Sequence, residues 1–353
     1  MGERAADGLT YAAAGVDIAA GERAVELIGP LVASTRRSEV IGGLGGFGGM
    51  FAIPPGRYRQ PVLVASTDGV GTKLEVARAV GRVTTIGIDL VAMCVDDLVC
   101  QGAEPMFFLD YLAVGRLDPE HVRDIVAGIA EGCRSAGCAL LGGEMAEHPG
   151  TMPAGGFDAA GFAVGIVERD EVIDGSAVRP GDALIGLLSP GLRSNGYSLA
   201  RSIIERAGLA LDDPAWPGAD RTLADELLVP SVVYAPVVLA LIGAVGAHAV
   251  AHVTGGGIPG NVPRVLPDGT TAVIDRRAWT VPRVFSELIR AGGVADDEAW
   301  RVFNMGVGMV VAVAPEDAAA AVEVAAGLGV GAAVIGEVAS GYPGVRFIGG
   351  TES

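Results

Sequence analysis

Residues Ile86 to Val114 read IGIDLVAMCVDDLVCQGAEPMFFLDYLAV, and the hydrophobic pattern changes its period once along this stretch. The segment Ile88–Gln101 is apolar at helical spacing and is interrupted only by acidic residues before its polar end. The segment Met106–Val114 is an apolar and aromatic run of strand length. A helix that leads directly into a strand is typical of proteins in which helices cover sheets.

The same alternation continues on both sides of this stretch, which predicts a mixed α/β (α+β) protein. Further strands are predicted at Pro61–Thr67, Ala139–Leu141, Phe162–Val167, Ala183–Leu188, Thr271–Ile274 and Gly308–Val313. Further helices are predicted at Glu120–Ala136, Tyr197–Ala207, Val284–Ala291 and Pro315–Gly327. The turn-rich, charged segment Glu168–Gly181 separates two halves that each contain strands and helices. We therefore expect two domains, residues 1–170 and 171–353.

The composition restricts the partners. Half of the 353 residues are hydrophobic, and 25 Lys and Arg stand against 42 Asp and Glu, for a net charge of −17. This sign disfavours nucleic acid and anionic membrane surfaces as partners. A phosphorylated small molecule remains compatible with an acidic protein, because backbone N–H groups and a bound divalent cation can supply local positive potential.

The segment Val232–Ala251 has no charged residue and reaches the length of a membrane-spanning helix. Pro236 and two glycines interrupt it, so we predict a buried helix (Pro236–Ala244) followed by a buried strand (Ala249–Val253).

The four cysteines form no C-x-x-C pair, and Glu3, Arg4 and Asp7 occupy the place where a signal peptide needs an apolar core. We expect reduced thiols and a cytoplasmic protein.

Two glycine-containing segments are candidates for binding phosphates. Asp68, Gly69, Gly71, Thr72 and Lys73 follow the strand Pro61–Thr67, so a carboxylate, flexible backbone and an ammonium emerge at one strand end. These are the parts needed to hold a metal-bound polyphosphate, although a charged turn would look the same.

The segment Gly42–Gly49 satisfies G-x-G-x-x-G, but it does not lie between a strand and a helix, which excludes a dinucleotide fold. It is either a flexible surface loop or a mobile lid over phosphates. The chain also has no Walker A motif.

Acidic residues in apolar surroundings suggest a metal site. Asp96 and Asp97 follow Asp89 by seven and eight residues, which places all three on roughly one face of the predicted helix. Adjacent carboxylates among apolar residues are costly to bury without a cation, unless one of them faces water. Glu144 is a further carboxylate close to a predicted strand end.

Two more segments combine polar side chains with a helix start or a glycine run. Ser194 and Asn195 are suitable N-cap residues for the helix at Tyr197, and the adjacent Arg193 makes an anion site an equal interpretation. His252 ends a predicted strand that runs into Thr254 and three glycines; taken alone, it is interpreted as a buried histidine.

Taken together and in order, these segments resemble the phosphoribosylformylglycinamidine cyclo-ligase family over most of the chain. The resemblance is carried by TYAAAGVDIAAGERAVELI (10–28), GGLGGFGGMF (42–51), STDGVGTK (66–73), IGIDLVAMCVDDLVCQGAEPMFFLDYLA (86–113), LLGGEMAEHPG (140–150), RSNGYSLAR (193–201), HVTGGGIPGNVPRVLP (252–267) and FNMGVGM (303–309).

The resemblance implies an ATP- and Mg²⁺-dependent enzyme that closes the imidazole ring of aminoimidazole ribotide from formylglycinamidine ribonucleotide, releasing ADP and phosphate. It also implies a homodimer whose N-terminal domains pair their sheets, with C-terminal α/β domains outside that contribute substrate-binding loops.

Site roles follow from the resemblance residue by residue. ATP would contact Gly45, Gly46, Phe47, Gly48, Asp68, Gly69, Gly71, Thr72 and Lys73, and the metal would bind Asp68 and Asp97. The substrate would lie along Glu144, Ser194, Asn195, Gly196, His252, Thr254, Gly255 and Gly256. Asp68, Lys73, Asp97 and Arg193 would be catalytic.

Arg193 departs from the family, which commonly has His at this position. Arginine cannot release a proton near neutral pH, so we interpret Arg193 as an electrostatic group, and the general base stays open. The alternatives are another phosphoryl-transfer enzyme of the same superfamily and a nucleotide-binding scaffold without catalysis. A selenophosphate synthetase would need a reactive cysteine near its N-terminus, whereas the first cysteine here is Cys94.

Overall fold

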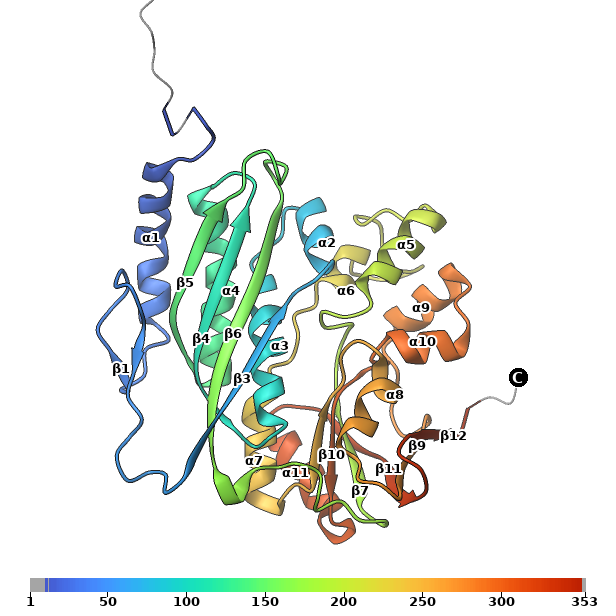
Figure 1. The fold of residues 1–353 in the computed structure, drawn as a ribbon. Coiled ribbons are helices and arrows are strands. Elements are labelled where there is room, and N and C mark those ends of the chain that lie inside the picture. The colour runs from blue at the N-terminus through green and yellow to red at the C-terminus, as the bar shows by residue number, and fades with distance from the viewer. Residues whose placement is uncertain (1–9, 12, 351–353) are drawn as a thin grey trace, which may run out of the picture.

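The computed structural model describes residues 10–11 and 13–350, which form two sheets with their covering helices (Figure 1). Glu3, Arg4 and Asp7, on which the expectation about a signal peptide depends, lie outside the described residues.

The first sheet has four strands in the order β3-β6-β4-β5. Their bounds are β3 (Pro61–Gly69), β4 (Glu104–Val114), β5 (Ala139–Glu147) and β6 (Phe157–Glu168). Only the β4–β5 pair is parallel. The helices α3 (Ile86–Val99) and α4 (Pro119–Ala136) lie behind this sheet in Figure 1, and α1 (Ile18–Ala33) packs along α4 and β5.

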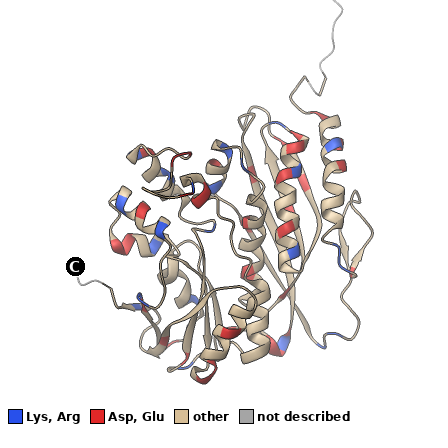
Figure 2. Cartoon of the chain, turned by 180° about the vertical axis from the view of Figure 1, so that it is seen from behind, with Lys and Arg blue, Asp and Glu red and all other residues tan. Residues whose placement is uncertain are grey.

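Local sequence explains these elements. The side chain of Asp118 accepts hydrogen bonds from the first amides of α4, and Gly137 ends the helix at a φ of +72°. The first half of β6 alternates buried and exposed residues, as expected for a strand with only one covered face. Seen from behind (Figure 2), acidic and basic residues lie on the outer surfaces of α1 and α4, and the buried faces are apolar.

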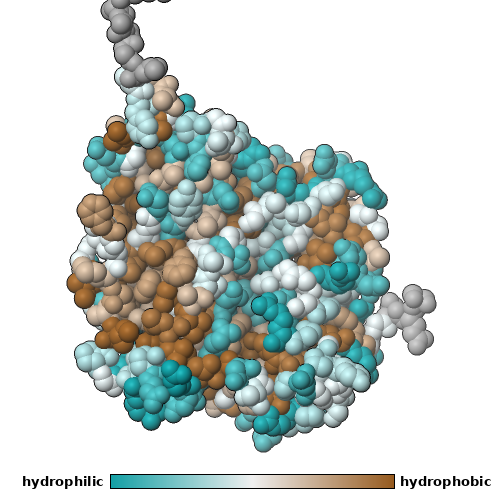
Figure 3. Space-filling view, in the orientation of Figure 1, coloured by the Kyte–Doolittle hydropathy of each residue, from teal (hydrophilic) through white to brown (hydrophobic). Residues whose placement is uncertain are grey.

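The front face of the first sheet carries exposed apolar side chains. Leu63 is 58% exposed, Tyr111 41% and Phe162 40%. Figure 3 shows apolar surface over the part of the molecule where Figure 1 places this sheet.

The second sheet has six strands in the order β12-β9-β11-β7-β10-β8. Their bounds are β7 (Ala183–Leu188), β8 (Ala249–His252), β9 (Thr270–Asp275), β10 (Val307–Val313), β11 (Ala332–Ser340) and β12 (Val345–Ile348). The accompanying helices are α5 (Tyr197–Ala207), α6 (Leu223–Leu227), α7 (Ala235–Val245), α8 (Gly257–Asn261), α9 (Arg283–Gly292), α10 (Asp296–Val302) and α11 (Ala318–Gly327). The remaining elements are the hairpin β1 (Val40–Ile41) and β2 (Met50–Phe51), and α2 (Lys73–Ala79).

The mixed α/β prediction is confirmed, and all predicted strands and helices are present, most of them with small shifts at their ends. Residues 139–141 cover only the beginning of β5 and residues 162–167 only the second half of β6, and β11 and β12 were not predicted. The apolar stretch 232–251 divides into α7 and β8 as predicted. Within residues 10–11 and 13–350, no helix combines the length and apolarity that crossing a membrane requires.

The helix α3 connects the two halves. It packs against β3 and β6 on one side and against α7 and β8 on the other, and the buried apolar residues of both halves form one continuous core. The acidic residues of α3 therefore lie where the two halves meet.

Candidate active site

A cavity of about 340 Å³, which we call the carboxylate cavity, opens between β3, α3 and the segment from β8 to α8. Asp68 lies at the end of β3, Asp97 near the end of α3, and His252 at the end of β8. The structure thus brings together three side chains that are far apart in the sequence. The other lining residues are Val64, Ala65, Ser66, Cys100, Gln101, Val250, Ala251, Thr254, Asn261, Arg264 and Val265.

Asp97 is held by two hydrogen bonds, one to each carboxylate oxygen. Its Oδ1 lies 2.9 Å from Nδ1 of His252, and its Oδ2 accepts from Oγ of Ser66 at 2.9 Å. Desolvation acts to raise the pKa of Asp97, but the hydrogen bonds from His252 and Ser66 outweigh it and lower the pKa. The side chain is 44% exposed, so an oriented, ionised carboxylate faces the cavity.

Asp68 has the opposite electrostatic character. Its Oδ1 accepts from the amide of Gly69 at 2.7 Å, yet desolvation of the carboxyl and the nearby charge of Asp97 raise its pKa. A divalent cation between two carboxylates that repel each other would remove this cost.

The cavity fits Mg²⁺ in its donor set. Mg²⁺ is usually held by one or two carboxylates together with waters and substrate phosphates, so Asp68 and Asp97 suffice. No cluster of three His, Cys, Asp or Glu side chains that could hold a metal by protein ligands alone occurs in the part of the chain that the structure describes.

The structure corrects the prediction that Asp89, Asp96 and Asp97 share a magnesium site. Asp89 and Asp96 are fully buried and each pairs with a buried cation. Both also accept hydrogen bonds from the segment 231–235 of the C-terminal half. This face of α3 therefore fastens the two halves together, and only Asp97 faces a cavity.

Lys73 does not have the predicted role of a phosphate contact. Its ammonium is fully buried, lies 2.7 Å from Oδ2 of Asp89, and donates to the carbonyl oxygens of Arg193 at 3.1 Å and Val229 at 2.8 Å. These three oxygens surround the three protons of the ammonium. Burial lowers its pKa, and the Asp89 carboxylate opposes that shift.

Arg193 is not an exposed anion-binding group either. Its side chain is 1% exposed and donates to Oδ2 of Asp96 at 2.6 Å and to the carbonyl oxygen of Val232 at 2.9 Å. The predicted N-cap function of Ser194 and Asn195 is also wrong, because α5 begins after Gly196, whose φ is +82°, without a side-chain cap.

Two of the segments expected to bind substrate do meet. A Cβ on Gly255 would lie 3.4 Å from Oδ1 of Asn195, so the turn before α5 and the turn before α8 are in contact. The hydroxyl of Ser194 is buried without a hydrogen-bond partner. Thr254 and Gly255 are tied to Asn261, which donates to the Gly255 carbonyl at 3.2 Å.

The glycine-rich segment lines a second cavity of about 490 Å³, which we call the glycine-loop cavity. Gly45, Gly46, Phe47 and Gly48 are among the residues that line it, and the side chain of Phe47 is fully exposed. Glu144, which was expected to help order the metal or the substrate, lines this cavity, whereas Asp68 and Asp97 line the carboxylate cavity. Glu144 also lies within β5, close to its carboxyl end.

Asp110 is a further carboxyl in the glycine-loop cavity. A Cβ on Gly143 would lie 2.3 Å from its Oδ1, so the glycine leaves room for the carboxyl. Burial raises the pKa of Asp110 to about 7.

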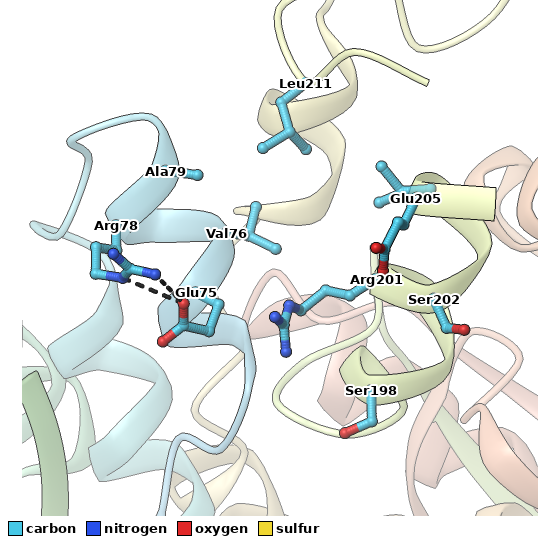
Figure 4. A pocket seen from close by; sticks show the side chains of 10 residues that line it. Glu75, Val76, Arg78, Ala79, Ser198, Arg201, Ser202, Glu205 and Leu211 are labelled. Carbon is cyan, nitrogen blue, oxygen red and sulfur yellow. Dashed lines mark hydrogen bonds and ion pairs between the residues drawn. The ribbon is translucent and has the colours of Figure 1, made fainter. Parts of the chain in front are cut away.

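A third cavity, of about 440 Å³, opens between α2 and α5 beyond the contact of Thr72 with Ser198. Figure 4 shows that Arg201 extends from α5 toward Glu75, which pairs with Arg78 on α2. None of the residues expected to bind ATP, metal or substrate lines this cavity.

Sequence reasoning missed four functional candidates. Ser66, Asn261 and Arg264 line the carboxylate cavity, and Asp110 lines the glycine-loop cavity. All four lie within the segments that carry the resemblance, so membership of those segments was the available signal. Only the fold shows which of their side chains face a cavity.

Comparisons with known proteins agree with this architecture. Residues 56–167 match the family model "AIR synthase related protein, N-terminal domain", and residues 179–347 match its C-terminal counterpart. Among solved structures, a thiamine-monophosphate kinase from Stenotrophomonas maltophilia K279a has a TM-score of 0.65 at 21% identity over 92% of this chain and 96% of its own. The hydrogenase maturation protein HypE in complex with ATP has a TM-score of 0.63 at 21% identity over 91% and 90%. These two show a shared fold.

Curated relatives are much more similar. The phosphoribosylformylglycinamidine cyclo-ligase of Myxococcus xanthus is 56% identical over 95% of this chain and 97% of its own length. That of Geotalea daltonii is 52% identical over 94% and 95%. The chain therefore belongs to the phosphoribosylformylglycinamidine cyclo-ligase family of ATP-dependent ligases.

Proposed function

We propose that this chain catalyses the ATP-dependent cyclisation of formylglycinamidine ribonucleotide to aminoimidazole ribotide in purine biosynthesis, and that phosphoryl transfer takes place in the carboxylate cavity. The observation that carries the assignment to this cavity is the convergence of Asp68 and Asp97 beside the Thr254 turn.

The reaction needs activation of a weak electrophile. A formamide carbon has no leaving group until the γ-phosphoryl of ATP is transferred to its oxygen, after which the ribose-bearing nitrogen can close the ring and phosphate departs. Mg²⁺, when bound, offsets triphosphate charge during this transfer. Asp68 and Asp97 would hold the metal, and Ser66 and His252 keep the Asp97 carboxylate in a fixed orientation.

Arg264 supplies the carboxylate cavity with the positive charge that the buried Lys73 cannot supply. It is exposed, and among the described residues it is the one Lys or Arg that lines the carboxylate cavity. Its Nη1 donates to Oδ1 of Asn261, the last residue of α8, at 3.2 Å. This hydrogen bond orients the guanidinium. A planar, permanently charged guanidinium is well suited to a phosphate.

The glycine segment is the proposed nucleotide lid, with Gly45, Gly46, Phe47 and Gly48 at its exposed part. A run of glycines loses much conformational entropy when it is ordered, so ligand contacts are needed to hold it. Amide hydrogen exchange of residues 42–49 should slow with Mg-ATP, and unchanged exchange would identify a structural turn.

The exposed front face of the first sheet is the proposed homodimer interface, with a second copy of this chain as its occupant. Leu63 and Phe162 lie on adjacent strands and are large apolar side chains that water contacts in the isolated chain. An isologous pairing of two such faces would bury them.

The activity is tested by ADP release from the purified protein. We expect release with formylglycinamidine ribonucleotide and Mg-ATP, together with formation of aminoimidazole ribotide, and background release with thiamine monophosphate. Release with thiamine monophosphate alone would identify a kinase of the same fold, and ATP binding without turnover of either compound would identify a scaffold.

A further inference from the structure

A buried chain of polar contacts runs from Asp96 through Arg193 and His252 to Asp97. The Nη2 atom of Arg193 lies 2.6 Å from Oδ2 of Asp96 and 3.2 Å from Nε2 of His252. Nδ1 of His252 lies 2.9 Å from Oδ1 of Asp97. Arg193, Asp96 and His252 are buried, and Asp97 is the member that faces the carboxylate cavity.

The contact with Arg193 determines which imidazole nitrogen carries the proton. A guanidinium has only donors, so Nε2 of His252 must be an acceptor without a proton. The neutral ring then carries its proton on Nδ1, and this N–H donates to Asp97. A second proton, on Nε2, would direct an N–H group of His252 at the guanidinium of Arg193, and two donors cannot form a hydrogen bond with each other.

We propose that Arg193 is a positioning residue: it holds His252 in the Nδ1–H tautomer and thereby keeps one oxygen of Asp97 in a permanent hydrogen bond. The consequence for catalysis rests on the proposed function, because it requires Asp97 to hold the metal of the nucleotide. The fixing of the tautomer itself does not depend on that function.

The charge of Arg193 is compensated where it lies. Asp96 pairs with it and also accepts hydrogen bonds from the amides of Tyr234 at 2.8 Å and Ala235 at 3.1 Å. The guanidinium carbon lies 4.7 Å from the centroid of the Tyr234 ring, so the ring restrains the guanidinium. Arg193 therefore acts on Asp97 through the direction of hydrogen bonds and adds little net charge.

The backbone at Arg193 supports a specific role for the side chain. Its φ is +63°, a left-handed conformation that is costly for a residue with a Cβ and is typical of glycine. The buried contacts with Asp96, Val232 and His252 hold the residue in this conformation. A lysine could pair with Asp96, but its single ammonium lacks the planar fork that holds three acceptors in fixed directions.

The wild-type protein provides the first test. It has only four histidines, so imidazole ¹⁵N NMR of the histidine-labelled protein gives few signals, and the His252→Gln variant identifies those of His252. We expect Nδ1 at a protonated shift and Nε2 at an unprotonated shift. The opposite tautomer, or two nitrogens averaged by exchange, would overturn the proposal without any variant of Arg193.

The second test compares Arg193→Met with Lys73→Met. Both variants remove a buried cation that joins the two halves, but the ammonium of Lys73 pairs with Asp89 and with the backbone carbonyls of Val229 and Arg193, and not with His252. We expect Arg193→Met to move both His252 nitrogen shifts toward their average and to raise the Mg²⁺ concentration for half-maximal ADP release at least tenfold. Lys73→Met should leave the His252 shifts in place.

Equal shifts in both variants would mean that packing, and not the Arg193 contact, sets the tautomer. If Arg193→Met does not fold, Arg193→Lys keeps a cation for Asp96 and should show the same shift change. If Arg193→Met alone changes the tautomer of His252 but the wild-type protein does not convert formylglycinamidine ribonucleotide, the proposed function fails. The positioning of His252 by Arg193 would still stand.

Discussion

The ammonium of Lys73 lies 2.7 Å from the carboxylate of Asp89, and neither side chain has any exposed surface. A buried ion pair is costly to break from one side, because the remaining charge is left without compensation. The same ammonium donates to the backbone carbonyls of Arg193 and Val229, so Lys73 is part of the connection between the two halves and is out of reach of a ligand.

Lys73→Met should therefore lower the free energy of unfolding by about 3–5 kcal/mol. Urea denaturation measures this, and Arg23→Met is the matched control because Arg23 pairs with Glu26 on the exposed side of α1. The control should cost about 0.5 kcal/mol or less. A Lys73→Met protein of normal stability with a weakened affinity for ATP would restore Lys73 as a phosphate contact.

Asp97→Asn should lower turnover at least a hundredfold and leave the fold intact, since a neutral amide is a poor Mg²⁺ ligand. Steady-state rates over a Mg²⁺ titration, with circular dichroism as the folding control, measure this. Near-normal rates at saturating Mg²⁺ would remove Asp97 from the site.

Substitution of the neighbouring Asp96 by Asn should affect stability more than turnover. A solvent-facing Asp96 would tolerate this substitution, but Asp96 is fully buried against Arg193. Asp96→Asn should mainly reduce stability, because it leaves the guanidinium unpaired. Unchanged stability of Asp96→Asn would contradict this.

Arg264→Gln should raise the apparent KM for ATP or for the ribonucleotide substrate at least tenfold, because it removes the cation of the carboxylate cavity. Arg201→Gln is the control, since Arg201 lines the separate cavity between α2 and α5. Arg201→Gln should leave both KM values within about twofold of the wild type. The tenfold change expected for Arg264→Gln corresponds to about 1.4 kcal/mol. The reverse pattern would place the phosphate between α2 and α5.

Asp110 should make the stability of the ligand-free protein depend on pH. Its folded pKa of about 7 lies above the ordinary value of about 3.9. The neutral carboxyl therefore contributes stability that is complete below about pH 4 and is lost as the pH rises through about 7. Thermal unfolding should show Asp110→Asn equal to the wild type at pH 4 and more stable at pH 8. Parallel Tm curves for the two proteins would show that Asp110 is not buried as described.

A double substitution, Leu63→Glu with Phe162→Glu, should convert a homodimer to a monomer, because charges on the front face of the first sheet oppose its burial. Sedimentation velocity measures the mass. Val172→Glu and Leu328→Glu change exposed apolar residues outside that sheet and should leave the mass of the wild type. A monomeric wild type, or a dimer that survives the double substitution, would exclude this interface.

Local sequence was sufficient for many of the regular elements. The helix at Tyr197–Ala207 and the strand at Ala183–Leu188 have the predicted bounds, because their hydrophobic periods and the adjacent glycines are local signals. The strands β11 and β12 were not predicted; β11 lies inside the second sheet but is only partly buried and its burial does not alternate regularly, and β12 is an edge strand of only four residues. The prediction that Asp68 and Asp97 lie at one site depended on the resemblance, and both carboxylates do line one cavity.

Local sequence patterns located many of the helices and strands and the segments that carry the family's motifs. Which charged groups are free to act depends on the folded arrangement of the two halves. Lys73 and Arg193 were expected to meet phosphate, and Glu144 was expected to help order the metal or the substrate. Lys73 and Arg193 instead find partners 16 and 97 residues away, and Glu144 lies in the glycine-loop cavity. Charge pairing depends on distances of a few ångströms between residues remote in the chain, and such distances are set by how α3 packs between the two sheets.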